Sequence, residues 1–359
     1  MDYQSLFDRI VEADPDFRRA FKHQRYFGTL EDILEETSTS LNKPNDELGV
    51  IRQALHPPRI IRAVIDYKVE NPQSPKVEFL VRDAIKLGLN VYRGSPCAAG
   101  DIEELKRKII ETGNLSLLGS VVKQVYDDVT WIATNPRRSS ETANNLIMDG
   151  VGQPVIFVAL GHGGVAAGMD TYLRYCDGAG ENGSTFYVVR FSNRKLGDVA
   201  PRLNTAEISY LQEQAKGRKP VIFDEDKFTG ITLGTAEQFF NRHVFPEKTR
   251  VLTNYDMDRE HLKGSSVQQK LLSQTFSKPW DYKEQGDINK IPLVMSDTGG
   301  FKEKFGGAHL LKIPGKESWG GLGGANYQGF SKILENVRLK LSRETKKAMA
   351  EYNSNQKSI

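Results

Sequence analysis

Two adjacent carboxylates occupy a position where the sequence could support sugar chemistry. Asp224 and Glu225 follow the apolar run 221–223, and a Thr-Gly-x-Thr sequence at 229–232 then opens a helix. Ligands of open α/β sheets bind at the carboxyl ends of strands. A loop entering a helix directs backbone N–H groups toward one point, and threonine hydroxyls add donors, which suits a phosphate monoester. Because carboxylates accept hydrogen bonds from vicinal hydroxyls, the segment predicts a phosphorylated sugar as ligand, rather than an ordinary acidic turn before a helix.

The elements that must position these residues alternate between strands and helices from residue 152 onward. Strands are expected at 154–160, 185–191, 220–223, 250–254 and 291–295, with a short sixth strand at 309–313. Helices are expected to follow the first three strands, ending near residues 176, 216 and 240. This alternation predicts the α/β fold class, with a mostly parallel sheet and helices on both faces.

The first 150 residues have a different character. They contain eight of the 32 glycines, whereas residues 151–330 contain 24, which places a boundary near Gly150. Their apolar spacing predicts mainly helices, at 51–65 with a break at Pro57-Pro58, and at 77–87, 102–111 and 115–132. We therefore expect a helical N-terminal region, 1–150, whose role the sequence does not reveal, and an α/β domain at 151–330.

The C-terminal residues 331–359 form a third unit. They hold seven basic and three acidic residues, whereas the whole chain has 49 basic and 46 acidic residues and a net charge of +3. The remaining chain is therefore close to neutral, which argues against a nucleic-acid-binding platform. A basic amphipathic helix packed on the body is the preferred interpretation of this tail, and a nucleic-acid arm is the alternative.

Composition restricts the class of protein further. With 359 residues, 38% hydrophobic and 26% charged, the chain is neither collagen-like nor wholly disordered. Its longest strongly apolar run, 155–160, is far shorter than the ~20 residues that cross a bilayer. The two cysteines, Cys97 and Cys176, form no metal-binding pattern. A soluble, cytoplasmic protein is expected.

The acidic segment resembles the phosphoribosyl-diphosphate (PRPP) signature of type I phosphoribosyltransferases. The resemblance implies that Asp224 and Glu225 hold the ribose hydroxyls and act in catalysis. It implies that the following loop holds the 5-phosphate, through Asp226, Lys227, Phe228, Thr229, Gly230, Ile231 and Thr232.

Two further segments resemble this family in order and spacing. The loop at Gly161, His162 and Gly163 is similar to the family's diphosphate loop. Residues 188–202 resemble the second strand and catalytic loop, which implies diphosphate binding by Arg190 and catalytic roles for Arg194 and Lys195.

The resemblance implies a type I phosphoribosyltransferase-like fold and a Mg²⁺-dependent reaction. Ribose 5-phosphate would pass from PRPP to a small-molecule nitrogen acceptor, with release of diphosphate. Mg²⁺ prefers phosphate and water oxygens with one or two carboxylates, so no dedicated protein metal site is expected. The expected partners are PRPP and the acceptor, with no nucleic acid and no membrane. A homodimer is left open.

Three departures from the family pattern keep alternatives open. Glu225 replaces the more usual Asp, Phe228 occupies the position of a catalytic Asp in purine-base members, and His162 occupies a position that is often basic. A PRPP-sensing regulatory protein without turnover is therefore the alternative. A dinucleotide fold is less favoured, because residues 185–191 do not end in the acid that would hold an adenosine ribose. The acceptor pocket could come from the N-terminal helices or from the Gly-rich region 297–324.

Overall fold

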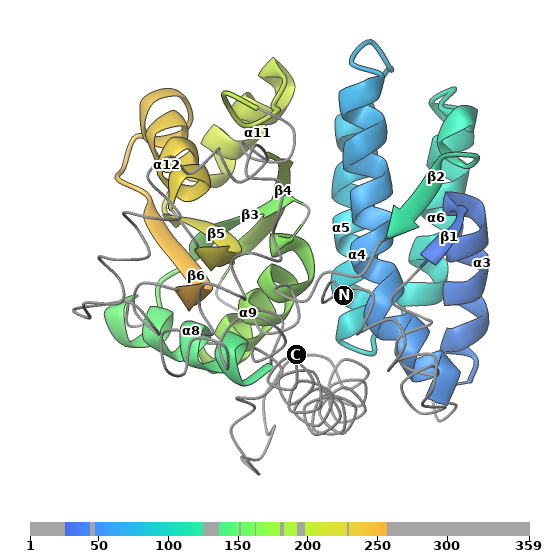
Figure 1. Cartoon of the computed structure of the whole chain (residues 1–359), viewed down its shortest axis with the longest axis horizontal. Coiled ribbons are helices and arrows are strands. Elements are labelled where there is room, and N and C mark those ends of the chain that lie inside the picture. The colour runs from blue at the N-terminus through green and yellow to red at the C-terminus, as the bar shows by residue number, and fades with distance from the viewer. Residues whose placement is uncertain are drawn as a thin grey trace, which may run out of the picture.

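The computed structural model describes residues 26–43, 47–124, 136–150, 152–161, 163–179, 183–191, 198–227 and 230–256. These residues form an α/β unit with a four-stranded sheet, and a mainly helical unit beside it (Figure 1). One continuous set of buried apolar side chains runs through both units. None of the described helices is long and apolar enough to span a membrane.

The sheet of the α/β unit is parallel, as the sequence predicts. Its strands are β3 (Val155–Gly161), β4 (Thr185–Arg190), β5 (Lys219–Lys227) and β6 (Arg250–Asp256), in the order β4-β3-β5-β6. All seven residues of β3 are buried, because an interior strand of a covered parallel sheet has no solvent-facing side. The expected strands at 291–295 and 309–313 and the expected C-terminal helix lie outside the described residues.

Helices cover both faces of this sheet (Figure 1). Helices α8 (Pro136–Gly150) and α9 (Gly164–Ala179) lie on one face, and α11 (Thr205–Gln214) and α12 (Ile231–His243) lie on the other. Helix α9 approaches the sheet closely at Gly168, where a Cβ atom would lie 2.9 Å from that of Ala159. The lack of a side chain at Gly168 therefore allows the short distance between α9 and β3.

Strand β5 extends further than the expected 220–223. It pairs with β3 only as far as Phe223, opposite Ala159, whereas its pairing with β6 continues to Lys227, opposite Asp256. The acidic segment 224–227 is therefore the end of a strand. Its regular backbone comes from β6, a long-range partner that local sequence does not disclose.

The N-terminal unit is mainly helical, with the helices α3 (Leu30–Leu41), α4 (Glu47–Glu70), α5 (Val77–Tyr92) and α6 (Ala98–Glu111). The expected break at Pro57-Pro58 is wrong, because α4 continues through both prolines. Both prolines are buried, and a Cβ atom on Gly88 of α5 would lie 3.5 Å from Pro57. Close packing between α4 and α5 offsets the missing backbone donors.

The expected helix at 115–132 is also wrong within the described residues. The chain there forms a short 3₁₀ turn, η1 (Leu115–Leu117), and then strand β2 (Val121–Gln124). Strand β2 pairs antiparallel with β1 (Tyr26–Thr29), with Thr29 opposite Val121. β-branched Val121 and Val122 suit a pleated strand, and this distant pairing overrides the apolar spacing that suggested a helix.

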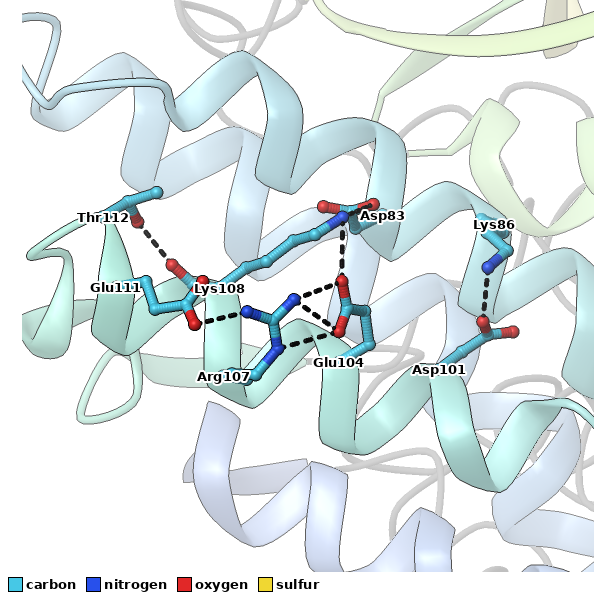
Figure 2. A network of polar contacts seen from close by, with 8 residues as sticks. All are labelled: Asp83, Lys86, Asp101, Glu104, Arg107, Lys108, Glu111 and Thr112. Atoms are coloured by element: carbon cyan, nitrogen blue, oxygen red, sulfur yellow. Dashed lines mark hydrogen bonds and ion pairs between the residues drawn. The ribbon is translucent and has the colours of Figure 1, made fainter.

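Surface ion pairs join α5 to α6 (Figure 2). Lys108 contacts Asp83 at 2.9 Å, and Lys86 contacts Asp101 at 2.7 Å. Arg107 lies between Glu104 and Glu111 on the exposed side of α6. Pairs between exposed side chains, such as those of Arg107, contribute ~0–1 kcal/mol each, and the buried apolar residues between these helices dominate their association.

A buried polar group joins the N-terminal helices to the α/β unit. The Nζ of Lys68, on α4, lies 2.6 Å from the Glu207 carboxylate of α11, and both side chains are buried. Tyr187, on β4, donates to the same carboxylate oxygen at 2.7 Å, and burial raises the pKa of this tyrosine. The two units therefore share a satisfied ionic contact in addition to their common core.

A buried histidine of the N-terminal unit lies between a cation and an acid. Arg59 can only donate, so the Nδ1 of His56 accepts from Arg59 at 3.1 Å and its Nε2–H donates to Glu36 at 2.9 Å. Burial, with a smaller effect of the Arg59 charge, lowers the pKa of His56 to about 4. The folded protein therefore holds this imidazole neutral.

We predict that stability falls as the pH is lowered from 6.5 to 4. In this range the unfolded chain binds a proton at residue 56 that the folded protein excludes, which costs about 3 kcal/mol. The measurement is urea unfolding at several pH values. His56→Gln should lack this part of the pH dependence, and exposed His243→Gln is the control. An unchanged slope in His56→Gln would contradict the assignment.

Candidate functional site

The acid pair and the first Gly-rich loop meet where the order of the sheet reverses. The chain runs from β3 to β4 on one side of β3, and then crosses to β5 on the other side. Ligands of open α/β sheets bind at such a switch point, at the carboxyl ends of the strands. A Cβ atom on Gly163 would lie 1.4 Å from Oε1 of Glu225, and one on Gly164 would lie 3.4 Å from Oδ1 of Asp224. The structure thus brings together two segments that are 60 residues apart in the sequence.

The Glu225 side chain lies over the loop that follows β3. Its carboxylate occupies space that any side chain at position 163 would need, so the glycine is required by close approach and not by an unusual backbone angle. The backbone N–H of Glu225 donates to Oδ1 of Asp224 at 3.1 Å, and both acids are half-buried. The extra methylene of glutamate, compared with aspartate, extends the carboxylate to the neighbouring loop.

The phosphate-loop residues divide between a strand end and a helix start. Asp226 and Lys227 belong to β5, and Lys227 makes an ion pair with Asp256 of β6 at 3.0 Å. Gly230 precedes α12 with a left-handed φ of 73°, and the stem of Lys227 crosses it, because a Cβ atom there would lie 3.1 Å from Lys227 Cε. Having no side chain, Gly230 cannot cap α12, whose first residues are Ile231 and Thr232.

Arg190 ends β4 at the same edge of the sheet, and its side chain is nearly buried. Its Nε donates to Asp66 of α4 at 2.8 Å, and its Nη1 donates to the Gly161 carbonyl at 3.2 Å. The Gly161 carbonyl also accepts from the backbone N–H of Phe191 at 3.3 Å. Arg190 therefore links the ends of two strands to the N-terminal unit, beside the predicted diphosphate loop.

Helix α4 reaches the candidate site, which sequence reasoning missed. A Cβ atom on Gly161 would lie 2.7 Å from Cδ1 of Ile65, so α4 rests directly on the end of β3. Asp66 follows it in the same turn and contacts Arg190. The sequence shows both residues only as part of an amphipathic helix, which gives no signal of the strand end they contact.

Several expected residues lie outside the part of the chain that the structure describes. These are His162, Arg194, Lys195, Phe228 and Thr229, together with the Gly-rich region 297–324. Among the residues that are described, no three His, Cys, Asp or Glu side chains gather to hold a metal ion. The described candidate site consists of Asp224, Glu225, Gly161, Gly163, Arg190, Asp226, Lys227, Gly230, Ile231 and Thr232.

Comparisons with protein-family models, with curated proteins and with solved structures give no match for this chain. Functional inference therefore depends on the sequence motifs and on the geometry of this site.

We predict that Gly163→Ala disturbs the contact between the loop and Glu225. The new methyl group overlaps the carboxylate, so the free energy of unfolding should fall by ~1 kcal/mol, at the lower end of overpacking costs, because the side chain can rotate away. In a Glu225→Ala background the same change should cost nothing. Gly100→Ala, with nothing within 4 Å, is the matched control for denaturant unfolding. Equal costs with and without Glu225 would show that the two residues do not interact.

Proposed function

We propose that this protein is a phosphoribosyltransferase with a type I-like fold, which transfers ribose 5-phosphate from PRPP to a nitrogen acceptor. The observation that supports it most is the contact of Glu225 with Gly163 at the switch point of a parallel sheet. Two motifs that the resemblance assigns to one substrate, the ribose acids and the diphosphate loop, are neighbours in space. Such proximity is required if both motifs hold one substrate.

The proposed roles follow the order of these groups along the edge of the sheet. Asp224 and Glu225 accept hydrogen bonds from the ribose hydroxyls. The phosphate lies toward the start of α12, beside Gly230 and Thr232, where backbone N–H groups lack intrahelical acceptors. The diphosphate lies at Gly161 and Gly163, which offer a close approach of the backbone.

The reaction displaces diphosphate from C1 of the ribose. The nitrogen acceptor forms a bond to C1, the C1–O bond breaks, diphosphate leaves with the bonding electrons, and the new C–N group loses a proton. Positive charge develops on the sugar, and the carboxylates of Asp224 and Glu225 stabilise it electrostatically. Arg190 interacts with the negative charge of the leaving group.

A divalent cation fits this site as a companion of the substrate. Asp224 and Glu225 offer one or two carboxylates, and the remaining ligands would be diphosphate and water oxygens, which is the set that Mg²⁺ prefers. When bound, the ion neutralises diphosphate charge. Asp224 and Glu225 are the residues that would contact it.

A PRPP sensor without turnover is the second candidate. Lys227 and Arg190, the described cations of the site, each make an ion pair with an acid, Asp256 and Asp66. This pairing leaves little uncompensated positive charge to stabilise a leaving diphosphate, which favours the sensor over the enzyme. Incubation with PRPP, Mg²⁺ and a panel of bases and small amines separates the candidates. Diphosphate release that depends on an acceptor indicates an enzyme, and tight binding without release indicates a sensor.

We predict that Glu225→Gln and Asp224→Asn each lower PRPP-dependent diphosphate release about ten- to hundred-fold. Each change removes one charge-assisted hydrogen bond to the ribose, worth ~1.5–3 kcal/mol. Melting temperatures should stay near the wild-type value, because both side chains are half-buried at the sheet edge. Glu213→Gln on α11, an exposed acid paired with Lys216, is the control and should retain full release.

Calorimetric titration of Glu225→Gln and Asp224→Asn with PRPP measures their PRPP affinity, and it tests the ribose-binding role of both acids for a sensor as well as for an enzyme. Wild-type PRPP affinity in both Glu225→Gln and Asp224→Asn would overturn the ribose-binding role. Tighter binding of NAD than of PRPP by the wild-type protein would instead favour the dinucleotide alternative.

A further inference from the structure

A guanidinium group is held in one orientation beside the candidate diphosphate loop. Arg190 donates through Nε to Asp66 at 2.8 Å and through Nη1 to the Gly161 carbonyl at 3.2 Å. Its third nitrogen, Nη2, makes no hydrogen bond with the residues that the structure describes. Because a guanidinium is planar and its donors are fixed relative to one another, these two contacts determine the direction of the remaining N–H groups.

The acid that orients Arg190 comes from the N-terminal unit. Asp66 lies on α4, 124 residues away in sequence, and its side chain is 36% exposed, whereas that of Arg190 is 9% exposed. The ion pair therefore lies at the rim of the sheet edge and is open to solvent on the Asp66 side. This position lets the carboxylate hold the guanidinium from outside while Gly161 contacts it from within.

Two neighbouring residues fix this turn of α4 on the sheet. Ile65 packs on Gly161, because a Cβ atom at position 161 would lie only 2.7 Å from Cδ1 of Ile65. Lys68 donates to the Arg202 carbonyl at 3.1 Å and to Glu207 at 2.6 Å. Asp66 lies between these anchors, so its carboxylate has a defined place relative to β3 and β4.

We propose that Asp66 is a positioning residue for the diphosphate subsite, because it holds Arg190 with Nη2 available to an anion bound at the loop after β3. The inference rests on the proposed function. It assigns to the N-terminal helical region a direct part in the site, through Arg190 and without contact to the substrate. A bound diphosphate then meets a donor whose orientation was fixed before binding, which limits the entropy lost on association.

Two probes that occupy different parts of the site test this role. Inorganic diphosphate with Mg²⁺ reports on the loop after β3 and on Arg190, and ribose 5-phosphate reports on Asp224, Glu225 and the start of α12. In the full chain, Asp66→Ala should weaken diphosphate binding about five- to ten-fold and leave ribose 5-phosphate binding unchanged. A general structural defect would weaken both probes together.

Two further variants separate orientation from charge. Asp66→Asn keeps an acceptor oxygen for the Arg190 Nε–H while it removes the negative charge, so its diphosphate affinity should stay within about threefold of wild type. Asp83→Ala removes another acid of the N-terminal unit, one that pairs with Lys108 of α6, and should behave as wild type. Circular dichroism confirms folding of each variant, and Asp66→Leu, which also removes the acceptor oxygen, carries the test if Asp66→Ala does not fold.

The possible results are distinct. Wild-type diphosphate affinity in Asp66→Ala overturns the inference and leaves the proposed function intact. Diphosphate affinity more than ten-fold above wild type in Asp66→Asn also overturns it, because Asp66 would then compete with the anion for Arg190. Failure of the wild-type protein to bind either probe or PRPP overturns the proposed function, and the inference with it.

Discussion

The close approach of β5 to the loop after β3 is the constraint on which the candidate site depends. Glu225 can lie over Gly163 only because that position has no side chain, and Gly164 meets the backbone of Phe223 and Asp224 in the same way. These glycines let α9 begin directly beside the end of β5. With larger residues there, the Glu225 carboxylate would have to rotate away from the loop, and the acids and the loop would no longer face one ligand.

The sequence indicates the sheet well because its strands carry their own signals. The apolar runs in β3 and β4 are buried on both sides of a parallel sheet, so composition alone identifies them. The order of the motifs along the chain also places the acids and the Gly-rich loop at strand ends. Their contact depends on strand order, which the sequence leaves undetermined until the fold is known.

The features that the sequence could not disclose are those that depend on distant partners. Strand β2 exists because β1 pairs with it, and the end of β5 is regular because β6 pairs with it. Helix α4 passes through Pro57 and Pro58 because α5 packs closely against it. The contact between Asp66 and Arg190 joins two units of the chain, and neither residue lies in a pattern that points to the other.

The buried pair of Lys68 and Glu207 constrains how this protein can change during evolution. Each residue sits on a different unit, and both are almost inaccessible to solvent. Loss of one partner would leave a charge in the interior without compensation, which typically costs about 3–5 kcal/mol. Joint replacement by two apolar residues avoids that charge, although Tyr187 then loses its acceptor. Substitutions at these two positions are therefore expected to be accepted together. Such pairwise inheritance would keep the helical and the α/β units matched to each other within any lineage that carries both.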